Sequence, residues 1–188
     1  MSNNNISGLH PTRTLKRELA SRVTRGCIVE IGVAYGDGIK EICGVTKAPV
    51  VGIDPFLPYV SFLGGGRYGP ETKRRYLENI AGVVNLAGKR PILIEKRAEV
   101  AAATWQGPIG LLWVDIGADK DYTWQVIKPY EPFVIQYIAI NGLEYSSSET
   151  PELVRRLERQ GMRDITDQIY VAVLQRVRFR QAGPRWVR

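Results

Sequence analysis

Cysteine and histidine are scarce in this sequence, and long apolar runs are absent. Cys27 and Cys43 fall in a predicted core strand and the following helix, so we expect buried thiols in a reducing compartment rather than a disulfide or half of a metal site. His10 lies in a polar leading segment, where we expect it to be exposed rather than catalytic. No apolar run approaches the roughly 18 residues of a membrane span, and residues 1–5 are polar. We therefore expect a cytoplasmic protein with no secretory signal and no membrane partner.

The bulk composition favours one globular domain that binds anionic partners. The chain has 188 residues, of which 44% are hydrophobic and 24% charged, which suits a single domain with a sizeable core. Its net charge of +7 favours phosphorylated substrates or nucleic acid. Much of this charge lies near the two ends, where solvent-exposed basic faces are the simplest expectation. The cations concerned are Arg13, Lys16, Arg17, Arg22 and Arg25, and Arg176, Arg178, Arg180, Arg185 and Arg188.

A strand followed by a glycine-rich turn organises the N-terminal half. The apolar run Cys27–Ile31 predicts a buried strand, which passes through glycines into a helical pattern. Gly32 permits a backbone conformation that side chains disfavour, while Gly36 and Gly38 allow a ligand to approach the backbone. Glu30 is unusual, because a carboxylate at the end of a buried strand needs a partner. An ammonium group or a hydroxyl on a ligand is one such partner.

This stretch carries a resemblance to a known family. Glu30-Ile31-Gly32-x-x-x-Gly36 resembles the first motif of S-adenosylmethionine-dependent methyltransferases with a Rossmann-like sheet. A nicotinamide oxidoreductase is disfavoured, because the dinucleotide pattern G-x-G-x-x-G requires glycine where Glu41 stands. The alternative is an α/β turn without a ligand. The resemblance implies cofactor binding by Glu30, Gly32, Val33, Ala34, Tyr35 and Gly36.

A second buried strand, over 49–53, ends in another acidic residue. Asp54 lies 24 positions after Glu30, in line with the spacing of about 20 residues between a glycine turn and a ribose-binding acid. The alternative is an Asp that only caps a turn. With Pro55 and Phe56, the glycine-containing loop over 57–70 and the predicted helix over 71–83, this part resembles small natural-product O-methyltransferases of the macrocin type.

The next two predicted strands cover 91–95 and 109–114. In the methyltransferases the turn after the first of these borders the adenine, which implies Arg97 and Ala98 as cofactor-binding residues. The second is fully apolar, as a central parallel strand should be, and ends at Asp115. By the same resemblance Asp115 is a candidate for cofactor binding, catalysis and metal binding.

Val114-Asp115, followed by the segment over 118–122, resembles the fourth motif of catechol and caffeoyl-coenzyme A O-methyltransferases. In that motif the first Asp binds a divalent metal and a nearby Lys acts as base, which makes Lys120 the candidate base. An exposed Lys120 in the first turn of a helix is the alternative. The chain departs from the motif by the insertion Ile116-Gly117, which blurs the choice of the metal-facing Asp.

The fifth predicted strand, over 133–140, bears on metal binding. It ends at Asn141, but Ile140 stands where the metal-dependent families have Asp. A Mg²⁺ site needs several oxygen ligands, usually including one or two carboxylates. Asp115 and Asn141 are the candidates, helped by Asp119 or Glu144, and the alternative is activity without a metal.

Together these patterns predict an α/β fold with a doubly wound, mostly parallel, seven-stranded Rossmann-like sheet. A leading helix from Thr12 or Thr14 to about Val23, a helix over 150–161 and a closing antiparallel hairpin over 163–176 complete it. We expect a flexible segment over 1–11, a single methyltransferase-like domain over 12–178 and a basic tail over 179–188.

The function implied is S-adenosylmethionine-dependent O-methylation of a small-molecule hydroxyl, with an anionic acceptor and a homodimer as further expectations. An RNA methyltransferase is the first alternative, favoured by the net charge but lacking an evident Lys-Asp-Lys-Glu set. A degenerate fold acting as a binding subunit is the second alternative, suggested by the missing carboxylate beside Asn141.

Overall fold

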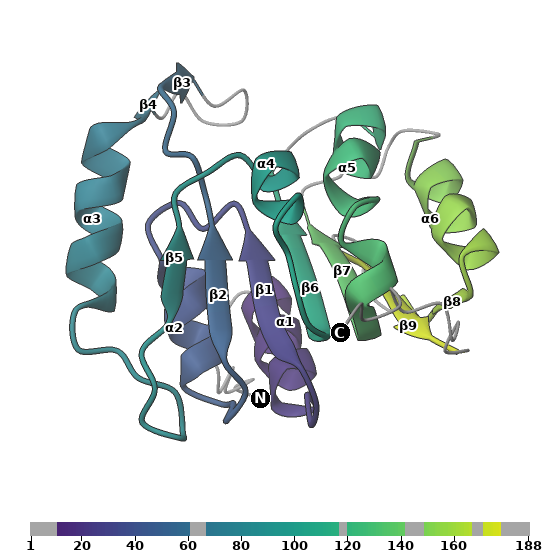
Figure 1. The fold of residues 1–188 in the computed structure, drawn as a ribbon, viewed down its shortest axis with the longest axis horizontal. Coiled ribbons are helices and arrows are strands. Elements are labelled where there is room, and N and C mark those ends of the chain that lie inside the picture. Colours follow the sequence, from purple (N-terminus) through teal and green to yellow (C-terminus); the bar gives the residue numbers. More distant parts are fainter. Residues whose placement is uncertain (1–10, 61–66, 117–119, 142–148, 167–170, 178–188) are drawn as a thin grey trace, which may run out of the picture.

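The computed structural model describes residues 11–60, 67–116, 120–141, 149–166 and 171–177. Its main feature is a seven-stranded sheet in the order β5-β2-β1-β6-β7-β9-β8 (Figure 1). The first five strands are parallel, and the last two form the predicted antiparallel hairpin. The strands are β1 Cys27–Ile31, β2 Val50–Ile53, β5 Ile92–Ile94, β6 Ile109–Asp115, β7 Val134–Asn141, β8 Met162–Asp164 and β9 Val171–Arg176. The predicted fold class is confirmed.

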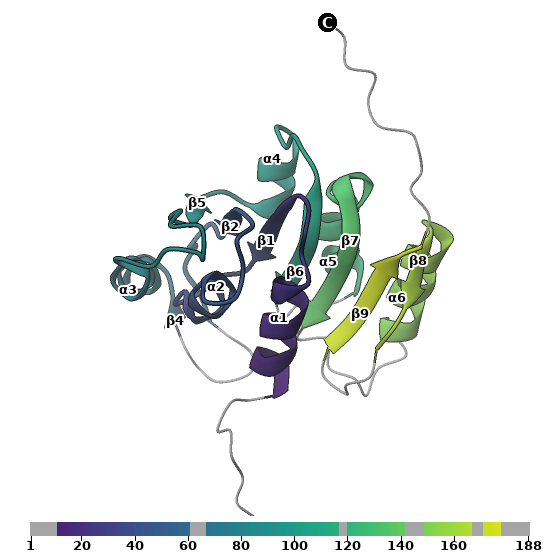
Figure 2. The same ribbon diagram turned by 90° about the horizontal axis from the view of Figure 1, so that it is seen from below.

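Helices cover both faces of the sheet, because its central strands are apolar on both sides. α1 (Pro11–Ser21) and α2 (Asp37–Cys43) pack on one face, with α3 (Pro70–Ile80) beside α2 (Figure 2). α4 (Ala98–Ala102), α5 (Lys120–Ile127) and α6 (Glu149–Arg159) pack on the other, and the 3-10 helix η1 (Glu131–Phe133) leads into β7. No helix of the described residues is long and apolar enough to cross a membrane.

The order in which the strands follow one another reverses at one point of the sheet, between β1 and β6. β1 pairs with both β2 and β6, and the chain runs outward from β1 through β2 to β5 before it crosses back to β6. Ligands of open α/β sheets bind at such a switch point, beyond the carboxyl ends of the strands. In Figure 1 this edge is the upper one.

The segment between β2 and α3 contains two strands that the sequence did not predict. β3 (Tyr59–Val60) and β4 (Arg67–Tyr68) pair antiparallel at the top of α3, within the stretch that we expected to be a loop. Both strands are two residues long, which is too short for a periodic pattern to be visible.

Two residues of the basic ends are buried, contrary to the expectation of solvent-exposed basic faces. The Lys16 side chain is 7% exposed and the Arg176 side chain 6%. Arg176 donates to the carbonyl oxygens of Val134, Gln160 and Glu131 at 3.1, 2.8 and 2.8 Å, and to the Glu131 carboxylate at 2.6 Å. It therefore ties β9 to the start of β7 and to the end of α6.

Candidate functional site

The turn after β1 is held tightly from two sides. Gly32 adopts φ of +84°, and its N–H donates to the Ile53 carbonyl at 2.9 Å, while the Gly36 N–H closes the turn on the Val33 carbonyl at 2.8 Å. A Cβ at Gly32 would lie 2.1 Å from the carbonyl oxygen of Asp115. Only glycine fits there, because the conformation and the neighbouring backbone both exclude a side chain.

Asp54 joins the turns that follow β1 and β2. Its Oδ2 accepts the N–H of Ala34 at 3.1 Å, and its Oδ1 accepts the N–H of Phe56 at 2.8 Å. Ala34 (φ +44°) and Phe56 (φ +46°) are the two non-glycine residues with positive φ in the described part of the chain. Backbone strain of this kind persists where surrounding contacts impose it, and it gathers at functional sites. Burial raises the pKa of Asp54, while its hydrogen bonds to Phe56, Ala34 and Val33 oppose the rise.

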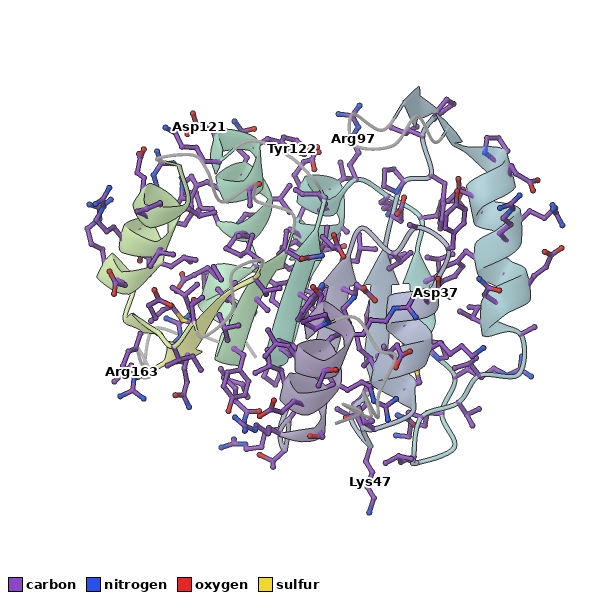
Figure 3. All side chains as sticks on the ribbon, turned by 180° about the vertical axis from the view of Figure 1, so that it is seen from behind. Asp37, Lys47, Arg97, Asp121, Tyr122 and Arg163 are labelled. Atoms are coloured by element: carbon purple, nitrogen blue, oxygen red, sulfur yellow. The ribbon has the colours of Figure 1, made fainter. Side chains whose placement is uncertain are left out.

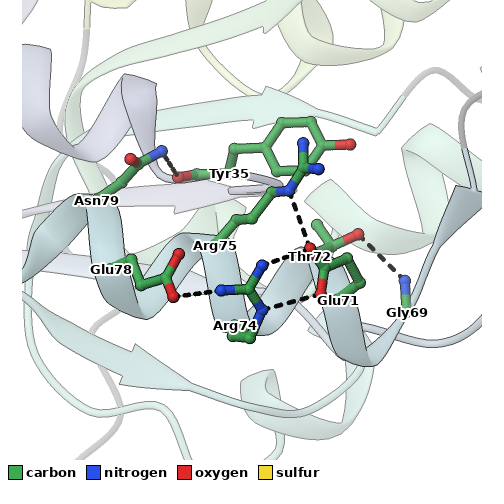
Figure 4. Close-up of polar contacts among 8 residues, drawn as sticks. All are labelled: Tyr35, Gly69, Glu71, Thr72, Arg74, Arg75, Glu78 and Asn79. Carbon is green, nitrogen blue, oxygen red and sulfur yellow. Dashed lines mark hydrogen bonds and ion pairs between the residues drawn. The ribbon is translucent and has the colours of Figure 1, made fainter.

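Helix α3 clamps the glycine turn, a role that the sequence did not reveal (Figure 4). The Asn79 amide donates to the Tyr35 carbonyl at 2.9 Å, and the Arg75 guanidinium lies 5.7 Å from the centroid of the Tyr35 ring. A Cβ at Gly36 would lie 2.9 Å from the Tyr76 ring. The Tyr76 ring thus packs closely against Gly36, and the assignment of Gly36 to cofactor binding stays a prediction.

Glu30 also finds its partner within the chain. The Lys16 ammonium of α1 lies 2.5 Å from Glu30 Oε1, and the two side chains are 7% and 3% exposed. Lys16 also lies 4.6 Å from the ring centroid of Trp113, which stands beside Glu30 on the neighbouring strand. Burial raises the pKa of Glu30 and Lys16 opposes the rise. A ligand is therefore not needed to supply the ammonium.

Gly38 belongs to the same cluster. A Cβ at this position would lie 2.1 Å from Glu30 Oε1 and 2.5 Å from Lys16 Nζ. The interpretation that Gly38 admits a ligand is therefore wrong, because the buried ion pair fills the space that a side chain would take.

Arg97 and Ala98 lie at the start of α4, on the same edge of the sheet. Ala98 is buried, and its carbonyl accepts the Tyr130 hydroxyl at 2.7 Å. The Arg97 side chain is 59% exposed and lies 3.9 Å from Glu99. Figure 3 shows Arg97 and Tyr122 along this upper edge. Burial raises the pKa of Tyr122, with Glu99 adding to the rise and Arg97 opposing it.

Lys120 is bound to an acidic partner. Its ammonium lies 3.0 Å from Glu152 Oε2 of α6, and Arg156 binds the other oxygen of the same carboxylate at 2.5 Å. These two cations lower the pKa of Glu152, Arg156 having the larger effect. A carboxylate partner favours the charged form of an ammonium group, which donates protons rather than accepting them. This pairing does not favour Lys120 as the base.

Asp115 and Asn141 lie side by side, as the strand prediction implied. They are paired in register at the carboxyl ends of β6 and β7. Among the described residues no group of three or more His, Cys, Asp or Glu side chains is placed to hold a metal ion. The further candidate ligands Asp119 and Glu144 lie outside the described residues.

Several solved structures share this architecture. An rRNA methylase from Streptococcus thermophilus matches with a TM-score of 0.60 at 13% identity, over 92% of this chain and 100% of that one. CalS11, a TDP-rhamnose 3′-O-methyltransferase of calicheamicin biosynthesis, matches with a TM-score of 0.60 at 19% identity, over 87% of this chain and 78% of that one. The magnesium protoporphyrin IX methyltransferase ChlM from Synechocystis PCC 6803, which has bound SAM, matches with a TM-score of 0.58 at 9% identity, over 87% and 78%.

The chain therefore has the methyltransferase fold. Identities this low show the shared fold alone. No protein-family model and no curated protein matches the sequence.

Proposed function

We propose that this protein binds S-adenosylmethionine and transfers its methyl group to a small-molecule hydroxyl. The observation that carries the proposal is Asp54, a partly buried carboxylate at the switch-point edge that holds two strained turns in place. Its two oxygens accept backbone hydrogen bonds from Ala34, Phe56 and Val33, and a carboxylate with about four lone-pair sites can accept further bonds. This remaining capacity suits a ribose hydroxyl, so the residues present fit a nucleoside.

The other cofactor-binding residues follow from this placement. Gly32, Val33, Ala34, Tyr35 and Gly36 form the turn beside Asp54, and Pro55 and Phe56 form the turn after it. Arg97 and Ala98, at the start of α4, would border the adenine. The cofactor brings a methyl group on a reactive sulfonium, so the protein's part is to position the acceptor and exclude water.

For the acceptor we assign two roles. Asp115, at the end of β6, is the candidate base that takes the hydroxyl proton. Lys120 remains a candidate catalytic residue, but its pairing with Glu152 favours a role in orienting the acceptor rather than in proton removal. The exposed Arg97 guanidinium suits an anionic acceptor.

The proposed methyl transfer does not depend on a metal ion. Asp115 and Asn141 supply one carboxylate and one amide oxygen, which falls short of the oxygen set that a dedicated Mg²⁺ site requires.

An RNA acceptor is the second candidate. The net charge of +7 favours it, and so does the similarity in fold to an rRNA methylase.

Methyl transfer from methyl-labelled S-adenosylmethionine tests the proposal. The assay would compare a panel of small hydroxyl acceptors with ribosomal RNA, each with Mg²⁺ and with EDTA. We expect label in small molecules and a loss of at least tenfold in Asp115→Asn. Label in RNA alone would favour the second candidate, and cofactor binding without transfer to any acceptor would favour a binding subunit.

A further inference from the structure

The buried pair of Lys16 and Glu30 bears on how the cofactor is recognised. Glu30 stands where the resemblance implied a cofactor-binding acid, at the end of β1 beside the glycine turn. Its Oε1 already holds the Lys16 ammonium at 2.5 Å. Its Oε2 is buried and has no hydrogen-bond partner among the described residues. Trp113 Nε1, on the adjacent strand, is likewise buried without a hydrogen-bond partner among these residues.

Lys16 is fixed in this position by its helix. Leu15, Leu19 and Ala20 of α1 are 6%, 2% and 0% exposed, so the face that carries Lys16 is packed into the core. The two neighbouring cations of α1 pair with α2, Arg17 with Glu41 at 3.0 Å and Arg13 with Asp37 at 3.8 Å. Withdrawing Lys16 would therefore require α1 to leave the sheet.

We infer that Lys16 is the permanent counter-ion of Glu30, so that Glu30 does not recognise the α-ammonium of the cofactor. A ligand ammonium on the same carboxylate would lie close to the Lys16 ammonium, and like charges in a buried setting repel each other strongly. It would also have to displace α1, because neither oxygen of Glu30 is reached by solvent. The inference rests on the proposed function, since it concerns the same cofactor.

The test removes the α-ammonium from the ligand and changes one side chain of the protein, and it compares the effect of each change on binding. Dissociation constants would be measured by calorimetry for S-adenosylhomocysteine and for its deaminated analogue, in which hydrogen replaces the α-ammonium. The ratio of the two dissociation constants reports how much affinity the ammonium contributes. A substitution that only loosens the fold changes both constants by the same factor and leaves the ratio unaltered. The proteins are the wild type, Glu30→Gln, Lys16→Met and the control Arg17→Met, which removes a partly exposed pair from the same helix.

We expect Glu30→Gln to leave the ratio within twofold of the wild type. Lys16→Met should also leave the ratio within twofold, because α1 still covers Glu30 in this variant, and Arg17→Met should leave it unchanged. A fivefold loss of preference in Glu30→Gln would overturn the inference, and so would a fivefold change of the ratio in folded Lys16→Met, because either would show that the ligand ammonium senses this buried pair. If Lys16→Met does not fold, the ratio in Glu30→Gln decides alone. Failure of the wild type to bind either ligand would overturn the proposed function and this inference with it.

Discussion

Removing the Lys16 ammonium should destabilise the protein in a pH-dependent way. Lys16→Met keeps an unbranched side chain against Trp113 but leaves Glu30 buried without its counter-ion. Breaking a buried ion pair from one side costs about 3–5 kcal/mol. We therefore expect the free energy of unfolding at pH 8 to fall by about 4 kcal/mol, a large part of the roughly 5–15 kcal/mol of a typical domain.

The sign of the pH dependence follows from Glu30. Burial already raises its pKa above the usual 4.5 while Lys16 opposes the rise, so removing Lys16 raises the pKa further. Above pH 4.5 the folded variant then holds a proton that the unfolded chain has released. Stability falls with rising pH where the native state binds more protons, by at most about 1.4 kcal/mol per pH unit for one proton. The deficit of Lys16→Met should therefore be smaller at pH 5 than at pH 8.

Urea unfolding at pH 5 and pH 8 measures both effects. The double variant Lys16→Met/Glu30→Gln removes both charges, and it should recover at least half of the loss at pH 8, because replacing both partners of a buried pair is often close to neutral. A Lys16→Met deficit below about 1 kcal/mol, or one that grows as the pH falls, would refute the reasoning.

Three further substitutions test local features by urea or thermal unfolding. Arg176→Met should lower the free energy of unfolding by about 4 kcal/mol, because it leaves three carbonyls and the Glu131 carboxylate without their hydrogen-bond donor. The control Arg163→Met, at an exposed position, should change it by no more than about 0.5 kcal/mol. Equal effects of the two substitutions would contradict this account. Gly38→Ala should cost about 1–3 kcal/mol through its clash with the ion pair, whereas Gly44→Ala, with no atom within 3.4 Å, should be tolerated. Ala34→Gly should stay within about 0.5 kcal/mol, since relief at φ +44° offsets the added chain entropy, and a loss above 1 kcal/mol would be evidence against strain there.

The sheet was predictable because its signals are local. An apolar run marks each of the five parallel strands in order, and Glu30, Asp54 and Asp115 mark the ends of three of them; the structure has all five strands. The placement of Asp54 beside the glycine turn also follows from the sequence, because parallel neighbouring strands end at one edge. The assignment of these residues to cofactor binding stays a prediction.

The buried cations were missed although the sequence holds a signal for each. Lys16 lies on the helical stripe formed by Leu15, Leu19 and Ala20, and Arg176 continues the alternation of Ala172 and Leu174 along β9. The charge of each side chain indicates exposure, whereas its position in the pattern indicates burial. A buried charge is unexpected until its partner is known, and each partner is far away in the sequence.

The strained turns and the α3 clamp had no such signal. Ala34 and Phe56 are not residue types that favour positive φ, so the contacts with Asp54 and not the local sequence account for their conformation. The hydrogen bond between Asn79 and Tyr35 joins residues 44 positions apart. Such contacts depend on how the elements pack, which a periodic pattern does not encode.

The most direct test of the account is calorimetric titration of the wild-type protein with S-adenosylhomocysteine, repeated on Asp54→Ala and on the control Asp164→Ala. Asp164 accepts a similar backbone hydrogen bond from Thr166 at 2.9 Å, but it lies on the edge strand β8, away from the switch point. We expect micromolar binding to the wild type and to Asp164→Ala, with at least tenfold weaker binding to Asp54→Ala. No binding to the wild type at millimolar ligand, or equal affinity in folded Asp54→Ala, would contradict the account.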